Sequence, residues 1–203
     1  MKALTRGAPS RLLPCVLLLA ALTGCGSSAA GSAPPPAAPT SAPVPTPATS
    51  TSWDIDPSFN ATDLAWIELA IPMDEQLLQV LRIAEKQATS PATKKFASEL
   101  AAGHRTELAQ FVELRTRSRL PVRNPHKGHD MPGMMTEPEV ATLAKTTGPA
   151  FDPLFEKNLK EHLDQSIVLA KSITTEGSDP AAKKLAASII TTRAGQLKQL
   201  SGL

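Results

Sequence analysis

Apolar residues recur at helical spacing from about residue 60 to the end of the chain, and no segment alternates like a β-strand. Neighbouring apolar positions lie mostly three, four or seven residues apart, which is typical of helices that bury one face. The pattern predicts four long helices with the apolar positions Leu64, Ile67, Ile71, Leu78 and Leu81; Phe96, Leu100, Phe111 and Leu114; Phe151, Phe155, Leu159, Leu169 and Ile173; and Leu185, Ile189, Leu197 and Leu200.

Capping signals mark where these helices begin. A polar residue can accept hydrogen bonds from the free N–H groups of the first turn, and a proline directly after it removes one of those groups at no cost. The expected starts are Asn60, Ser90-Pro91, about Ala150 and Asp179-Pro180. The third long helix should end at Gly177. A capping box at residues 136–139 predicts a further short helix that ends near Gly148.

The helical part of the chain repeats itself after 89 residues without a gap. Each single match is of a common kind, so the shared register is what indicates a duplication. The paired positions are Asp63 and Asp152, Trp66 and Phe155, Pro91 and Pro180, Lys94-Lys95 and Lys183-Lys184, Ala97 and Ala186, Leu100 and Ile189, and Leu108 and Leu197. Two duplicated hairpins bury their apolar faces against each other, which predicts an all-α four-helix bundle over residues 57–203.

Polar residues interrupt all four apolar stripes at about half of their height. They are Asp74 on the first helix, His104 and Glu107 on the second, His162 and Ser166 on the third, and Arg193 and Gln196 on the fourth. We call this set the polar belt. Charges inside a bundle must be paired or must hold a metal, and carboxylate and imidazole metal sites are built on the facing helices of bundles.

Two interpretations of the polar belt are open. In the first, its acidic and imidazole side chains converge on a metal ion; these are Asp74, His104, Glu107 and His162. In the second, the belt is a salt-bridge network in which Arg193 pairs with Asp74 or Glu107 and the histidines are hydrogen-bonded. Arg193 favours the second, because a guanidinium keeps its proton and supplies the charge that a cation would.

A second group of potential ligands lies in the sequence NPHKGHDMPGMM, residues 124–135, which we call the His/Met loop. It holds two of the chain's four histidines and three of its five methionines: His126, His129, Met131, Met134 and Met135. Imidazole and thioether groups suit Cu(I), and imidazole with a carboxylate suits Cu(II) or zinc. Alternatively, Met131 and Met134 cover one end of the bundle as adaptable core residues and the histidines are solvated.

The first 24 residues are typical of an export signal. Basic residues precede an apolar run from Leu12 to Leu22, which is too short to span a bilayer. The sequence Leu-Thr-Gly-Cys at residues 22–25 resembles a bacterial lipobox, which implies cleavage before Cys25 and attachment of a lipid to it. Residues 25–56 are then a lipidated cysteine and a linker rich in Pro, Ala, Ser and Thr. We expect a protein tethered to the extracytoplasmic face of a membrane.

Removal of this signal changes the charge and the thiol count. It holds three of the 21 basic residues and no acid, so the remaining chain has 18 basic and 19 acidic residues and a net charge of −1. Nothing therefore indicates a nucleic-acid partner. Cys15 leaves with the signal and Cys25 is lipidated, so no thiol remains for a disulfide or a nucleophile.

The segment Phe-Asp-Pro-Leu-Phe at residues 151–155, followed by His162, resembles domain-of-unknown-function family 305 (DUF305), as does Met-Pro-Gly-Met at residues 131–134. The resemblance covers about residues 59–203. It implies a ferritin-like helical duplication and a role in extracytoplasmic metal handling, with copper and silver as the expected metals. Each half of that family typically carries a His-His pair and, on the returning helix, Gln-x-x-Glu.

This chain departs from the family pattern at those positions. Met73-Asp74 and His162-Leu163 stand at the two His-His pairs, and residues 104–107 and 193–196 stand at the two Gln-x-x-Glu motifs. Three of the four histidines are absent, which implies a diverged member.

Two functions follow from these observations. The first is a lipid-anchored protein that binds copper or another soft metal through the His/Met loop. The second is a non-catalytic module that docks a protein partner in the cell envelope and whose ancestral metal site has become a salt-bridge network. We do not expect an enzyme, because the sequence shows no Ser/His/Asp or Cys/His arrangement and no glycine-rich phosphate loop. The sequence leaves the oligomeric state open.

Overall fold

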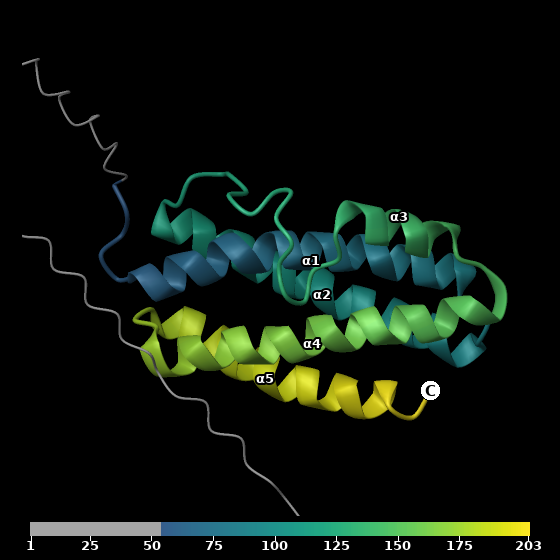
Figure 1. Cartoon of the computed structure of the whole chain (residues 1–203). Helices are drawn as coiled ribbons and strands as arrows, with labels where there is room; N and C mark the ends of the chain where they lie inside the picture. Colours follow the sequence, from purple (N-terminus) through teal and green to yellow (C-terminus); the bar gives the residue numbers. More distant parts are fainter. Residues whose placement is uncertain (1–53) are drawn as a thin grey trace, which may run out of the picture. The chain divides into compact units, whose positions relative to one another are not determined.

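The computed structural model describes residues 54–203 (Figure 1). This part of the chain contains helices and no strand, which confirms the all-α prediction. The elements are α1 (Ala61–Gln87), α2 (Pro91–Ser118), α3 (Glu137–Lys145), the short 3-10 helix η1 (Gly148–Ala150), α4 (Phe151–Glu176) and α5 (Pro180–Leu200). The predicted signal at residues 1–24, the lipidation site Cys25 and the linker up to residue 53 lie outside the described residues.

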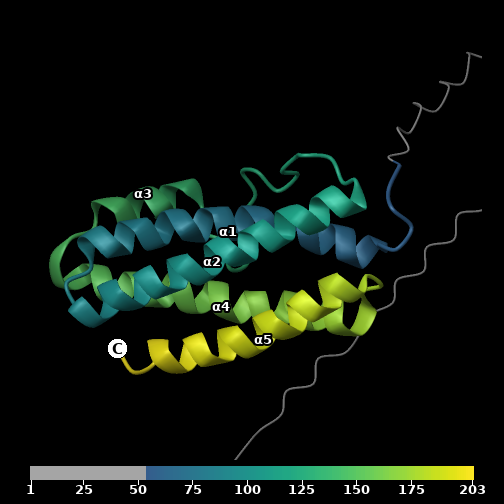
Figure 2. The same cartoon turned by 180° about the vertical axis from the view of Figure 1, so that it is seen from behind.

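The four long helices form two hairpins that lie side by side (Figures 1 and 2). Helix α1 pairs with α2 and α4 with α5, and the hairpins meet where α1 packs against α4 and α2 against α5. The chain crosses between the hairpins through the His/Met loop and α3, which lies against α1 and α4. None of the helices between residues 54 and 203 is long and apolar enough to cross a membrane.

The helix starts agree with the capping signals. Asn60 forms a capping box with Asp63, and the side chains of Ser90 and Asp179 accept backbone N–H groups of α2 and α5. The capping box at residues 136–139 is also present. However, α3 ends at Lys145, three residues before the predicted end at Gly148.

Helix α3 ends because Thr146 leaves the helical region, with a ψ of 130°. Two residues later, Gly148 has a φ of +65°, which a continuing α-helix would not accommodate. It also precedes Pro149, whose ring disfavours the helical conformation of the residue before it. The chain therefore turns into η1 before α4 begins.

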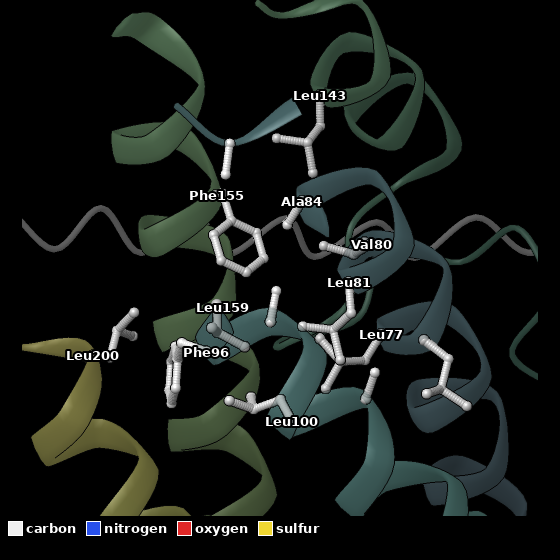
Figure 3. Close-up of a cluster of buried hydrophobic side chains, with 14 of the residues drawn as sticks. Leu77, Val80, Leu81, Ala84, Phe96, Leu100, Leu143, Phe155, Leu159 and Leu200 are labelled. Atoms are coloured by element: carbon white, nitrogen blue, oxygen red, sulfur yellow. The ribbon is translucent and has the colours of Figure 1, made fainter. Parts of the chain in front are cut away.

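Two apolar clusters fill the bundle, one on each side of the polar belt. The cluster near α3 is shown in Figure 3, where Phe155 and Leu159 of α4 face α1, Phe96 and Leu100 come from α2, and Leu143 of α3 covers one side. The other cluster is built around Trp66, Ile67, Phe111, Ile173 and Ile189, and the rings of Trp66 and Phe111 meet edge to face at 4.8 Å. The polar belt therefore lies between two apolar layers.

Two repeat-equivalent aspartates join the hairpins. Asp63 of α1 accepts the backbone N–H groups of Ser178 and Asp179, in the turn between α4 and α5, at 2.9 and 3.1 Å. Asp152 of α4 accepts those of Thr89 and Ser90, in the turn between α1 and α2, both at 2.9 Å. Burial raises the pKa of Asp152, but hydrogen bonds from Thr89 and Ser90 outweigh it and lower this pKa overall. Each hairpin thus provides the aspartate that accepts the backbone N–H groups in the turn of the other hairpin.

Candidate metal centre

The polar belt brings three potential metal ligands together in the middle of the bundle. Asp74 comes from α1, His104 from α2 and His162 from α4, and all three are buried. One possible ligand atom from each lies within 4.8 Å of the other two. Within residues 54–203 this is the one group of three His, Asp or Glu side chains that meets that distance. We call it the core cluster.

The ring of His104 is bonded on one side and free on the other. Its Nδ1 lies 2.8 Å from Oδ1 of Asp74, whereas its Nε2 is buried without a hydrogen-bond partner. When Asp74 is ionised, Nδ1 must carry the proton that is donated to it. Nε2 then has a free lone pair, and the second oxygen of Asp74, Oδ2, is also buried without a partner.

His162 has the same arrangement with a different partner. Its Nδ1 lies 3.1 Å from the backbone oxygen of Gly133. A carbonyl oxygen only accepts, so Nδ1 carries the proton and Nε2 has the lone pair. This Nε2 is buried and unpartnered as well. The two rings lie 5.7 Å apart between centroids, at 65°, so the core cluster holds two neighbouring imidazoles with free Nε2 atoms.

Arg193 and Glu107 form an ion pair beside the core cluster. Nη2 of Arg193 bonds Oε1 of Glu107, and Nη1 donates to Oε1 of Gln196 at 3.3 Å. The same Nη2 lies 3.9 Å from Oδ1 of Asp74. Of the four predicted core ligands, Glu107 is therefore engaged by Arg193, and the other three converge. Each interpretation of the polar belt describes part of it.

Burial governs the protonation of the core cluster. It raises the pKa of Asp74 to about 7, although Arg193 opposes this. It lowers the pKa of His104 to about 3, and the charge of Arg193 adds to the effect. Burial also lowers the pKa of His162 well below its ordinary value. Both imidazoles are consequently neutral at neutral pH, which is the state that binds metals.

The His/Met loop is fastened to the bundle at its second half. The side-chain amide of Gln76 accepts the backbone N–H of Met135 at 2.7 Å and donates to its carbonyl at 2.6 Å. Gly133 has a φ of +77°, and a Cβ there would lie 2.5 Å from Cβ of Gln165 on α4. The loop backbone thus lies directly on α4, where the carbonyl of Gly133 accepts a hydrogen bond from His162.

The predicted loop ligands differ in their surroundings. Met135 is buried and belongs to the apolar cluster near α3, and Met131 and Met134 are half-buried. His126 is half-buried and His129 is exposed. Both histidines and Met134 line an open groove of about 690 Å³ between the loop, α1 and α3. The core-filling interpretation named Met131 and Met134, which are only half-buried, and it is Met135 that belongs to the core. Metal binding by the loop stays a prediction.

Sequence reasoning missed the contact of Gly133 with His162. Glycine after proline indicates a turn, but it does not tell which side chain the turn's carbonyl group meets. The role of Asp63 and Asp152 was also missed, although their equivalence in the repeat marked them.

The described residues thus form a duplicated helical bundle with a buried Asp/His cluster. Residues 63–203 match the family described as domain of unknown function (DUF305), and the chain belongs to this family. No curated protein matches it.

Solved structures share the fold at low sequence identity. A DUF305 fragment from Deinococcus radiodurans is 17% identical, with a TM-score of 0.64 over 71% of this chain and 95% of that chain. A DUF305 protein from Streptomyces coelicolor is 17% identical, with a TM-score of 0.62 over 68% and 89%. CopM in its Cu(I)-bound form is 21% identical, with a TM-score of 0.59 over 70% and 95%. These likenesses establish the fold.

Proposed function

We propose that this protein binds copper or a similar soft metal ion at the core cluster of Asp74, His104 and His162. The observation that carries the proposal is the pair of buried Nε2 atoms without a hydrogen-bond partner. Leaving one buried polar atom unsatisfied costs about 1–3 kcal/mol, so two of them in one cluster favour a bound ligand. A metal ion between the rings would satisfy both.

The surroundings of the two imidazoles fit a metal. Metal-binding histidines usually donate their other N–H to a carboxylate or a backbone carbonyl, which fixes the ring and its tautomer. Asp74 serves His104 in this way and Gly133 serves His162. Oδ2 of Asp74 is free to become a third ligand. Structures of CopM with Cu(I), Cu(II) and silver bound support the same choice of metals.

We further propose that the protein works outside the cytoplasm, anchored by a lipid on Cys25, and that it buffers or passes on the metal rather than catalysing a reaction. The lipobox and the uncharged linker support the anchor. Metabolic labelling with a radioactive fatty acid tests it. The wild type should be labelled and fractionate with membranes, and a Cys25→Ser variant should do neither. Labelling of that variant would contradict the anchor.

The metal site is tested by Cu(I) titration against a chromogenic chelator. We would use the full-length chain with Cys15 and Cys25 replaced by serine, so that no thiol competes. A His162→Asn variant keeps an N–H that can reach Gly133 but loses the free Nε2, and we expect at least about 10-fold weaker binding.

A matched loop variant distinguishes the two candidate sites. It carries His126→Ser, His129→Ser, Met131→Leu and Met134→Leu, and it keeps Met135 because that side chain is part of the apolar core. It should bind Cu(I) as the wild type does. Binding that survives His162→Asn and disappears in the loop variant would place the metal in the His/Met loop instead.

The alternative function is a partner-docking module of the cell envelope. It is favoured by the ion pair of Arg193 and Glu107, in which the guanidinium of Arg193 supplies a positive charge inside the bundle without a metal. No Cu(I) competition by the wild type would reject the metal-binding proposal and leave this alternative.

A further inference from the structure

Arg193 places a permanent positive charge inside the proposed metal site. Its side chain is only 1% exposed. The guanidinium bonds Glu107 and lies 3.4 Å from Nδ1 of His104 and 3.9 Å from Oδ1 of Asp74. A guanidinium cannot lose its proton in a protein, so any cation bound by the core cluster shares the site with this charge.

The charged groups of the polar belt can be counted helix by helix. Helix α1 contributes the carboxylate of Asp74, α2 that of Glu107, and α5 the guanidinium of Arg193. Helix α4 contributes His162 and no charged side chain. The nearby Glu75, Arg105 and Glu161 are exposed to water, which screens them. With both carboxylates ionised and both imidazoles neutral, the most negative net charge that the belt can reach is therefore −1.

We propose that Arg193 is a specificity-determining residue that makes the core cluster selective for a singly charged soft cation, such as Cu(I) or Ag(I), over a divalent one. This inference rests on the proposed metal-binding function. A single positive charge brings the belt to zero. A divalent ion leaves an excess positive charge buried between two apolar layers, which costs far more than the same charge in water.

The repeat relates the charge of Arg193 to a ligand position in the first hairpin. Arg193 occupies the position 89 residues after His104, and Gln196 the position 89 residues after Glu107. In the first hairpin these positions hold an imidazole and a carboxylate, whereas in the second they hold a cation and its neutral hydrogen-bond partner. The site therefore offers ligands from α1, α2 and α4 and a positive charge from α5. Such a site offers three protein donors, so a tetrahedral divalent ion would need a water molecule as its fourth ligand.

The test compares the affinities for Ag(I) and Zn(II) in the same protein. Isothermal titration in chloride-free buffer, with the full-length chain free of cysteine, gives both dissociation constants. Arg193→Gln removes the charge and keeps a polar side chain. Because attraction scales with the charge of the ion, Zn(II) should gain more than Ag(I), and the preference for Ag(I) should fall by about 10-fold or more.

Three further variants separate charge from geometry. Glu107→Gln should raise the preference for Ag(I), because the most negative net charge of the polar belt becomes zero. This variant tests the role of charge even where Arg193→Gln fails to fold. The double variant, Arg193→Gln with Glu107→Gln, restores the most negative net charge of the polar belt to −1 and should show the wild-type preference for Ag(I). Arg193→Lys keeps the positive charge and should also show the wild-type preference. Arg117→Gln breaks an ion pair with Asp179 away from the polar belt and should leave the preference unchanged.

The outcomes distinguish the two proposals. Shifts of the Ag(I) preference in opposite directions in Arg193→Gln and Glu107→Gln would support the inference. An unchanged preference in folded variants that still bind metal would overturn the role of Arg193 alone. Absence of Ag(I) binding by the wild type would overturn the metal-binding function itself.

Discussion

The core cluster and the His/Met loop hold the same kinds of ligand in opposite surroundings. In the core, His104 and His162 come from rigid helices, and each ring is fixed by one hydrogen bond at Nδ1. In the loop, His126 and His129 line an open groove, and the backbone of one bonds to that of the other across a turn. Only the core has imidazoles that are buried and oriented before a metal arrives.

This difference shows why residue spacing is a weak guide to a metal site. A short run of histidines and methionines is conspicuous in the sequence, yet burial and hydrogen bonding decide whether its lone pairs are held in place. The core ligands lie 30 and 58 residues apart in the sequence and meet only because four helices bring their polar positions to one level. Substitutions confined to one of the two regions separate their contributions.

The largest effect on stability should come from removing the charge that balances the core. Arg193→Ala leaves Glu107 and Asp74 buried without their cation, and breaking a buried ion pair costs about 3–5 kcal/mol. Urea unfolding followed by circular dichroism measures this loss, and Lys127→Ala in the loop serves as the control with almost no effect. A loss below about 1 kcal/mol for Arg193→Ala would mean that water reaches Glu107 and replaces the guanidinium.

The contact between the two regions should come next. Gly133→Ala places a Cβ against Gln165, which forces the loop away from α4 and breaks the bond from His162 to the Gly133 carbonyl. We expect a loss of about 1–3 kcal/mol, as for other overpacked sites, together with weaker Cu(I) binding.

Gly128→Ala is the matched control for this change. Gly128 has a similar φ of +79°, but nothing lies within 4 Å of its added Cβ. It should therefore show only the backbone strain of about 1–2 kcal/mol and no change in Cu(I) affinity. Equal Cu(I) affinities in Gly133→Ala and Gly128→Ala would show that the contact of the loop with His162 does not contribute to metal binding.

A smaller effect should appear in the pH dependence of stability. The pKa of His162 is lowered in the folded protein, so the unfolded chain takes up a proton below pH 6.5 that the folded protein does not. Stability from this group is thus present above pH 6.5 and is lost as the pH falls, by up to about 1.4 kcal/mol per unit. The lowered pKa of His104 acts in the same direction, whereas the raised pKa of Asp74 acts against it.

Asp74 and His104 are present in both the wild type and a His162→Asn variant, so His162 should dominate the difference between the two proteins. Urea unfolding at pH 7 and pH 5.5 measures it. The wild type should lose more stability on acidification than the variant does. Parallel losses would show that His162 is already protonated in the fold.

The smallest effect is expected in the loop itself. His126→Ser combined with His129→Ser should change the free energy of unfolding by less than about 0.5 kcal/mol, as for most surface substitutions. A thermal melt without metal is sufficient to measure it. A loss of more than about 1 kcal/mol would mean that these imidazoles support the docking of the loop on α1.

The predictability of the fold from sequence follows from local signals. Asn60, Ser90 and Asp179 cap their helices because short polar side chains can do so wherever they stand, and the repeat paired the two hairpins. The level of the polar belt was also visible as breaks in the apolar stripes. These features depend on residues close together in the sequence or on a simple period.

The details of the site depend on contacts between distant segments and were not predictable in this way. Whether Arg193 bonds Glu107 or Asp74 is decided by how α1, α2 and α5 pack against one another. The meeting of Gly133 with His162 depends on how a loop lies on α4. Such choices are made by packing, and no propensity or spacing encodes them.

Asp63 and Asp152 each bond the turn of the opposite hairpin, which bears on whether one hairpin can fold alone. Neither hairpin contains the carboxylate that its own turn needs, so neither is a complete folding unit. A single α1–α2 hairpin produced alone would recover this contact by pairing with a second copy, in which Asp63 of each chain would face Thr89 and Ser90 of the other. The domain therefore has the internal organisation of a symmetric dimer joined into one chain.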